Sequence, residues 1–134
     1  MNQIAKIDIE FKEGEAIVPY SLGYRCSQNK PVVWNDNSKF KEKLKKIIKN
    51  SLPQEISPVP LKNGIGIKVM ILTPHNHSCY NKPDLDNMIK TIIDAGTGIV
   101  YEDDCQVCYL NAFKTTSVSN RWSLRIRYYN IGAQ

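Results

Sequence analysis

The stretch KPDLDNMIKTIIDAGTGIVYEDDCQV, residues 82–107, organises the rest of this chain. It contains five aspartates and one glutamate of the chain's 13 acidic residues, although the formal net charge of the chain is +5. Its apolar residues recur at i, i+3, i+4, i+7 and i+8, a spacing that indicates one buried face of an amphipathic helix. These residues are Leu85, Met88, Ile89, Ile92 and Ile93. We expect Asp84 to cap this helix and Gly96 and Gly98 to end it.

Carboxylates lie at both ends of the predicted helix. Asp84 and Asp86 flank its start, where both can converge on one point; inside a helix they would diverge by about 200°, because each residue turns the chain by about 100°. Asp103 and Asp104 come later, just before a strand-like run. Carboxylate oxygens are the hard donors that Mg²⁺ and Mn²⁺ prefer. A divalent-metal site is therefore expected if the helix start and the strand start meet.

The same acids also have an ordinary structural interpretation. Aspartate at a helix start is commonly only a cap, favoured by the helix macrodipole. The i, i+4, i+8 series of Asp86, Lys90 and Asp94 is compatible with a solvated ladder of salt bridges, which contributes little stability. Residues 102–104 fit a charged surface turn equally well. Spacing alone leaves both interpretations open.

The combined motif resembles that of a known nuclease family. DLDN at residues 84–87, then Lys90 and Asp94, then DDxQV at residues 103–107 are similar to the signature of the RusA family of Holliday junction resolvases. The resemblance implies a small, homodimeric, Mg²⁺-dependent endonuclease that cuts four-way DNA junctions in recombination and repair. Genes for such enzymes are often carried by prophages.

Roles for individual residues follow from this resemblance. It implies that Asp84, Asp86 and Asp104 are catalytic and hold Mg²⁺, for which Mn²⁺ is expected to substitute. It also implies that Lys90 is the catalytic-site lysine and that Asp103 is an auxiliary acid. A two-fold homodimer would suit a junction in which two strands are cut.

Basic residues elsewhere in the chain suit a polyanionic partner. A second helix is expected from Asp36 or Ser38 to about residue 50, and six lysines crowd its polar face, which either attracts phosphates through counterion release or is simply solvated. We expect Arg25, Lys30 and Lys82 to contact DNA. Two alternatives stay open: a non-catalytic basic module that binds nucleic acid, and a related nuclease that acts on other branched DNA, such as flaps or forks.

Composition indicates one globular domain, residues 1–134. The chain is 42% hydrophobic and 23% charged, as is typical of globular proteins. It has neither a membrane-length apolar run nor the apolar stretch of a signal peptide, so a cytoplasmic protein without membrane contact is expected. Cys105 and Cys108 fall in the strand-like run CQVCYLNAF, and residues three apart in a strand face opposite sides. Reduced cysteines are therefore favoured over a zinc site.

The order of elements predicts an α+β fold, with a mixed β-sheet and two main helices packed on one face, as in RusA-like proteins. Strands are expected at residues 4–11, 31–34, 65–72, 106–113 and 122–129. Residues 20–30 are expected to form a loop and residues 114–120 a turn. His75 and His77 fall in a polar loop, where a histidine is either a general acid–base or has no chemical task.

Overall fold

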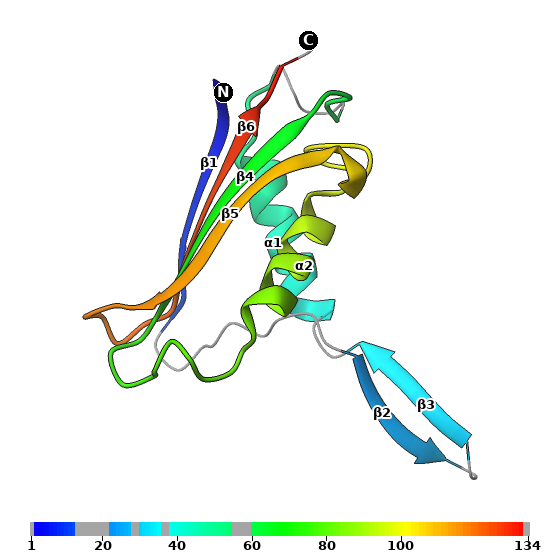
Figure 1. Cartoon of the computed structure of the whole chain (residues 1–134), viewed down its shortest axis with the longest axis vertical. Coiled ribbons are helices and arrows are strands. Elements are labelled where there is room, and N and C mark those ends of the chain that lie inside the picture. Colours follow the sequence, from blue (N-terminus) through cyan, green and yellow to red (C-terminus); the bar gives the residue numbers. More distant parts are fainter. Residues whose placement is uncertain (1, 13–21, 28–29, 36–37, 55–59, 133–134) are drawn as a thin grey trace.

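A computed structural model describes residues 2–12, 22–27, 30–35, 38–54 and 60–132 (Figure 1), and of residues 22–27, 30–35 and 38 it describes the backbone alone. The elements, in chain order, are β1 (Asn2–Glu10), β2 (Leu22–Ser27), β3 (Lys30–Asn35), α1 (Ser38–Ser51), β4 (Ile65–Thr73), α2 (Leu85–Gly96), the short 3₁₀ helix η1 (Asp104–Gln106), β5 (Val107–Thr116) and β6 (Ser123–Asn130). Neither described helix has the length and apolar character that crossing a bilayer requires.

Four strands form a mixed sheet in the order β1-β6-β4-β5. β4 and β5 are parallel, whereas β6 is antiparallel to both β1 and β4. A parallel pair needs a crossover connection, and the segment that contains α2 provides it. Both helices lie on the same face of the sheet (Figure 1). The predicted α+β fold is therefore confirmed.

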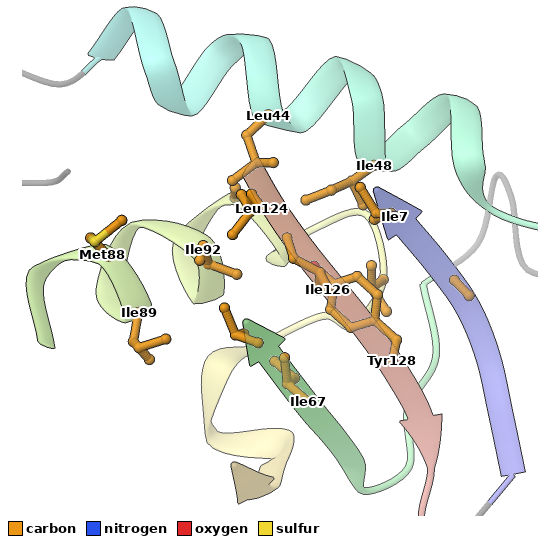
Figure 2. Close-up of a cluster of buried hydrophobic side chains, with 14 of the residues drawn as sticks. Ile7, Leu44, Ile48, Ile67, Met88, Ile89, Ile92, Leu124, Ile126 and Tyr128 are labelled. Carbon is orange, nitrogen blue, oxygen red and sulfur yellow. The ribbon is translucent and has the colours of Figure 1, made fainter. Parts of the chain in front are cut away.

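The core lies between the sheet and the two helices (Figure 2). Alternate residues of the strands point towards the helices, and they meet the apolar stripes of α1 and α2. The following core side chains are less than 2% exposed: Ile7, Leu44, Ile48, Ile67, Met88, Ile92, Leu124, Ile126 and Tyr128. Burial of each such side chain stabilises the fold by about 1.5–3 kcal/mol. This packing fixes α2, which carries most of the acidic motif, against the sheet.

Within the loop expected at residues 20–30, residues 22–27 and Lys30 instead belong to two paired strands. β2 and β3 pair antiparallel from Leu22↔Asn35 to Ser27↔Lys30 and form a separate two-stranded sheet (Figure 1). A loop was predicted because the residues of β2 are mostly polar. In the structure, pairing with β3, which contains β-branched residues, holds them in a strand despite that composition.

The turn expected at residues 114–120 begins later than predicted. β5 extends to Thr116 because its parallel pairing with β4 continues as far as Thr73↔Thr116. Lys114 is consequently a strand residue, paired with the buried Ile71 on the side of the sheet that faces the helices. The start of the strand is also shifted, because residues 104–106 form η1 before β5 begins.

Candidate active site

One pocket collects acidic and basic side chains from α2 and η1. Asp86, Lys90 and Asp94 line it from α2, and Asp104 lines it from η1. The three α2 residues are spaced by four, so they share one face of the helix. The pocket has a volume of about 280 Å³, and the side chains of Ile89 and Ile93 complete its lining. The structure therefore places Asp86 and Asp104 at the same pocket as Lys90, together with Asp94.

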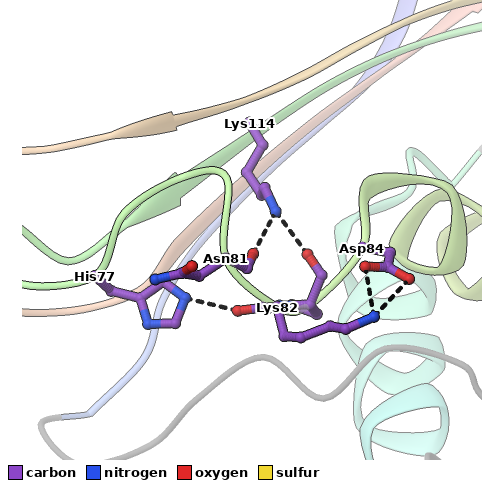
Figure 3. Close-up of polar contacts among 6 residues, drawn as sticks. His77, Asn81, Lys82, Asp84 and Lys114 are labelled. Carbon is purple, nitrogen blue, oxygen red and sulfur yellow. Dashed lines mark hydrogen bonds and ion pairs between the residues drawn. The ribbon is translucent and has the colours of Figure 1, made fainter.

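Asp84 occupies the N-cap position of α2, but its side chain contacts Lys82 and not the backbone N–H groups of the helix start. Its backbone is extended, and its side chain makes no capping hydrogen bond. Both carboxylate oxygens instead accept hydrogen bonds from Lys82 Nζ, at 3.0 and 3.1 Å (Figure 3). The expectation that the Asp84 side chain caps the helix was wrong, because the lysine two residues earlier provides a charged donor. Asp84 is also not among the residues that line the pocket.

The acidic turn at residues 102–104 is held by a capping box. Asp103 accepts a hydrogen bond from the backbone N–H of Cys105 at 3.0 Å. Gln106 Oε1 accepts from the backbone N–H groups of Glu102 and Asp103, each at 2.9 Å. This reciprocal arrangement satisfies donors that a helix start otherwise leaves unpaired. Asp103 therefore has a structural role, which is to fix the turn that presents Asp104.

Gln106 and Tyr101 attach this turn to the rest of the molecule. Gln106 Nε2 donates to the carbonyl groups of Leu61 and Asn63, each at 2.9 Å. The buried Tyr101 donates its hydroxyl hydrogen to the Ile93 carbonyl at 2.5 Å, which joins the residue before the acidic turn to the last turns of α2. Sequence reasoning assigned neither residue a task. Gln106 belongs to the DDxQV motif, but the motif did not predict the hydrogen bonds that Gln106 makes.

Negative charge accumulates around Asp104. A hydrogen bond with the Asp103 side chain raises the pKa of Asp104, and burial and the charges of Asp103 and Asp94 act in the same direction. The pKa of Asp103 is lowered, first by the Cys105 backbone N–H and then by the Asp104 side chain. Burial raises the pKa of Tyr101, and the charges of Asp94 and Asp104 add to this effect. A cation in the pocket would relieve this repulsion.

The donor set of the pocket fits a hard divalent cation. Asp86, Asp94 and Asp104 provide carboxylate oxygens, the ligand type that Mg²⁺ selects. Within the described part of the chain, however, no three histidine, cysteine, aspartate or glutamate side chains form a ready metal-binding group. Cation binding would therefore require these carboxylates to move closer together.

Among the other candidate residues whose side chains are described, none lines this pocket. Lys82 is paired with Asp84. Arg25 lies in β2 and Lys30 begins β3, outside the part of the chain whose side chains are described. His77 Nε2 contacts the Lys82 carbonyl at 2.6 Å (Figure 3). His75 Nδ1 contacts the carbonyl of a loop residue at 3.2 Å. Neither histidine lines the pocket.

Of Cys105 and Cys108, only Cys105 differs from the expected strand setting. Cys105 lies in η1 rather than in a strand, and Cys108 follows in β5. Both are free thiols, as is Cys79.

Comparison with known proteins identifies the family. A model of the family described as Endodeoxyribonuclease RusA matches residues 24–127, which include every residue that lines the pocket. A search of curated proteins finds no match. The family match covers well over half of the chain's 134 residues, and it agrees with the motif and the α+β fold. The chain therefore belongs to the RusA endodeoxyribonuclease family.

Proposed function

We propose that this protein is a Mg²⁺-dependent endonuclease that cuts four-way DNA junctions during recombination or repair. Family membership supports the nuclease chemistry. The observation that carries the proposal is that α2 and η1, which are separate in sequence, bring Asp86, Lys90 and Asp104 to one pocket. Carboxylates beside a lysine are suited to a metal ion and a phosphodiester.

The residues would divide the chemistry as follows. Bound Mg²⁺ supplies charge stabilisation at the phosphate and lowers the pKa of a coordinated water. Asp86 and Asp104 would hold the ion, and Lys90 would stabilise negative charge that develops on the phosphate oxygens. Asp103 would act as the auxiliary acid by holding the turn that carries Asp104.

Asp84 would join the ligand set by leaving its ion pair with Lys82. The two side chains are 45% and 84% exposed, respectively. An exposed pair of this kind contributes about 0–1 kcal/mol, so a divalent cation competes with it easily. Lys82 would then be available to a DNA phosphate.

The rest of the molecule supplies affinity for DNA. The net charge of +5 and the lysines of α1 favour a polyanion, and Arg25, Lys30 and Lys82 are the residues that we expect to contact phosphates. A four-way junction has two strands to cut, so two copies of the chain related by a two-fold axis would place one pocket at each strand.

Cleavage of synthetic DNA tests the proposal. Wild type, Asp86→Asn and Asp104→Asn are compared on a labelled four-way junction, a flap, a fork and a linear duplex, each with and without Mg²⁺. We expect the wild type to cut the junction only with Mg²⁺, and each variant to be slower by at least about 100-fold while still binding the junction.

Other outcomes would redirect the assignment. Variants that cut at the wild-type rate would contradict the proposed pocket. Salt-sensitive binding without cutting would support the non-catalytic module, and faster cutting of flaps or forks would change the substrate but keep the chemistry.

A further inference from the structure

A lysine on β5 contacts the segment that leads into α2. The ammonium group of Lys114 donates hydrogen bonds to the carbonyl oxygens of Asn81, at 2.8 Å, and Pro83, at 2.6 Å (Figure 3). These two carbonyls flank Lys82, and the residue after Pro83 is Asp84. The half-buried Lys114 therefore grips the chain immediately before the first acidic residue of the motif.

This position is unfavourable for a cation unless the carbonyl groups compensate. The start of a helix carries partial positive charge, which repels an ammonium group. The α2 hydrogen-bond ladder begins with the Met88 N–H donating to the Asp84 carbonyl at 3.1 Å, so the Pro83 carbonyl lies outside it. Lys114 supplies the donor that the helix does not. Hydrogen bonds from an ionised donor are stronger than neutral ones.

β5 is connected to both elements that carry the pocket carboxylates. At its start, β5 follows directly from η1, which carries Asp104. Near its end, Lys114 holds the entry to α2, which carries Asp86. β5 pairs with β4 from Val107 to Thr116, so one continuous paired strand links the two sources of pocket carboxylates.

We propose that Lys114 is a positioning residue of the active site: by holding the carbonyls of Asn81 and Pro83, it sets where α2 starts and hence where Asp84 and Asp86 stand relative to Asp104. This inference rests on the proposed function, because it concerns the same metal-binding carboxylates. Lys114 does not line the pocket, so it acts through the backbone and not on the substrate.

Three variants separate positioning from a general effect of charge. Lys114→Met keeps an unbranched apolar side chain and removes the donor, and Lys114→Arg keeps a cationic donor. Lys68→Met is the matched control: Lys68 is on β4, it is exposed on the opposite face of the sheet, and its amine lies 5.2 Å from the ring centre of Tyr129. It removes the same charge without touching the α2 entry.

Two readouts are needed. Electron paramagnetic resonance titration of Mn²⁺ measures metal affinity without DNA, and junction cleavage at varied Mg²⁺ gives the half-saturating metal concentration alongside KM for DNA. Loss of a residue that orients metal ligands typically lowers metal affinity by about 10–100-fold. We expect Lys114→Met to weaken Mn²⁺ binding by at least about tenfold, to raise the half-saturating Mg²⁺ concentration similarly and to leave KM for the junction near that of Lys68→Met. Lys114→Arg should recover most of the affinity.

The result that overturns the inference is wild-type metal affinity in Lys114→Met, or an equal loss in Lys68→Met. If Lys114→Met does not fold by circular dichroism, Lys114→Arg decides, and a loss of more than about tenfold in that variant contradicts the inference. If the wild type cuts no branched DNA but Mn²⁺ affinity still depends on Lys114, the proposed function fails while the positioning role stands. If the wild type cuts junctions normally but Mn²⁺ affinity does not depend on Lys114, the proposed function stands and the positioning role fails.

Discussion

Replacement of Gln106 by alanine tests how the acidic turn is held. The carboxamide makes four hydrogen bonds of 2.9 Å, two as acceptor from the N–H groups of Glu102 and Asp103 and two as donor to the carbonyls of Leu61 and Asn63. A typical intramolecular hydrogen bond contributes about 1 kcal/mol net. Water can replace the first two, which are exposed, more easily than the second two, which are partly buried. We therefore expect Gln106→Ala to lower the free energy of unfolding by about 2 kcal/mol.

Urea denaturation measures this loss of stability. A second variant separates the contribution of the acceptor oxygen from that of the Nε2–H donors. Gln106→Glu keeps the acceptor but loses the two Nε2–H donors, so it should lose the contacts with Leu61 and Asn63. Mn²⁺ affinity should fall in both variants, because the turn that presents Asp104 is no longer fixed. A change below about 0.5 kcal/mol in Gln106→Ala, with unchanged Mn²⁺ affinity, would refute this reasoning.

Two further substitutions test other contacts around the pocket. Gly96→Ala places a Cβ atom 2.6 Å from Tyr101 Oη and 2.9 Å from its Cζ. The overpacking should cost about 1–3 kcal/mol and outweigh the gain of about 1 kcal/mol in helix propensity, so the variant should be less stable in urea. Equal or higher stability would contradict the packing described for Tyr101. Lys82→Met releases Asp84 from its ion pair and removes a proposed phosphate contact. It should leave Mn²⁺ affinity equal or up to about fivefold higher, weaken junction binding and reduce its salt slope by about one, whereas weaker Mn²⁺ binding would show that Lys82 supports the metal site.

Periodicity was sufficient to predict the elements with a buried face. The i, i+3, i+4 pattern from Leu85 to Ile93 predicted α2, and the alternation from Ile65 to Ile71 predicted β4, which lies at an interior position of the sheet. Both patterns result from burial against a core, and burial governs the choice of secondary structure more strongly than local propensity does.

Features that depend on pairing with another strand were not predicted. The hairpin of β2 and β3 depends on pairing between two strands, and the extension of β5 through Lys114 depends on the parallel β4. Neither pairing leaves a local signal strong enough to outweigh polar composition.

The candidate site was anticipated in its composition more than in its contacts. The acidic motif drew attention to Asp86, Lys90 and Asp104, which line one pocket. The i, i+4, i+8 spacing also placed Asp94 on one helix face with Asp86 and Lys90, although it assigned Asp94 no role at a metal. The motif did not indicate that Asp84 turns to Lys82. Side-chain direction at a helix start depends on which charged groups lie within reach, and sequence spacing alone does not fix that choice.

The most direct test is the location of Mn²⁺ by its anomalous signal in crystals of the wild-type protein. The proposed function predicts one ion in the pocket between α2 and η1, with carboxylate oxygens of Asp86 and Asp104 about 2.0–2.2 Å from it. The proposal would be contradicted if crystals held at a near-saturating Mn²⁺ concentration contain no bound ion, or contain Mn²⁺ only at sites away from both aspartates.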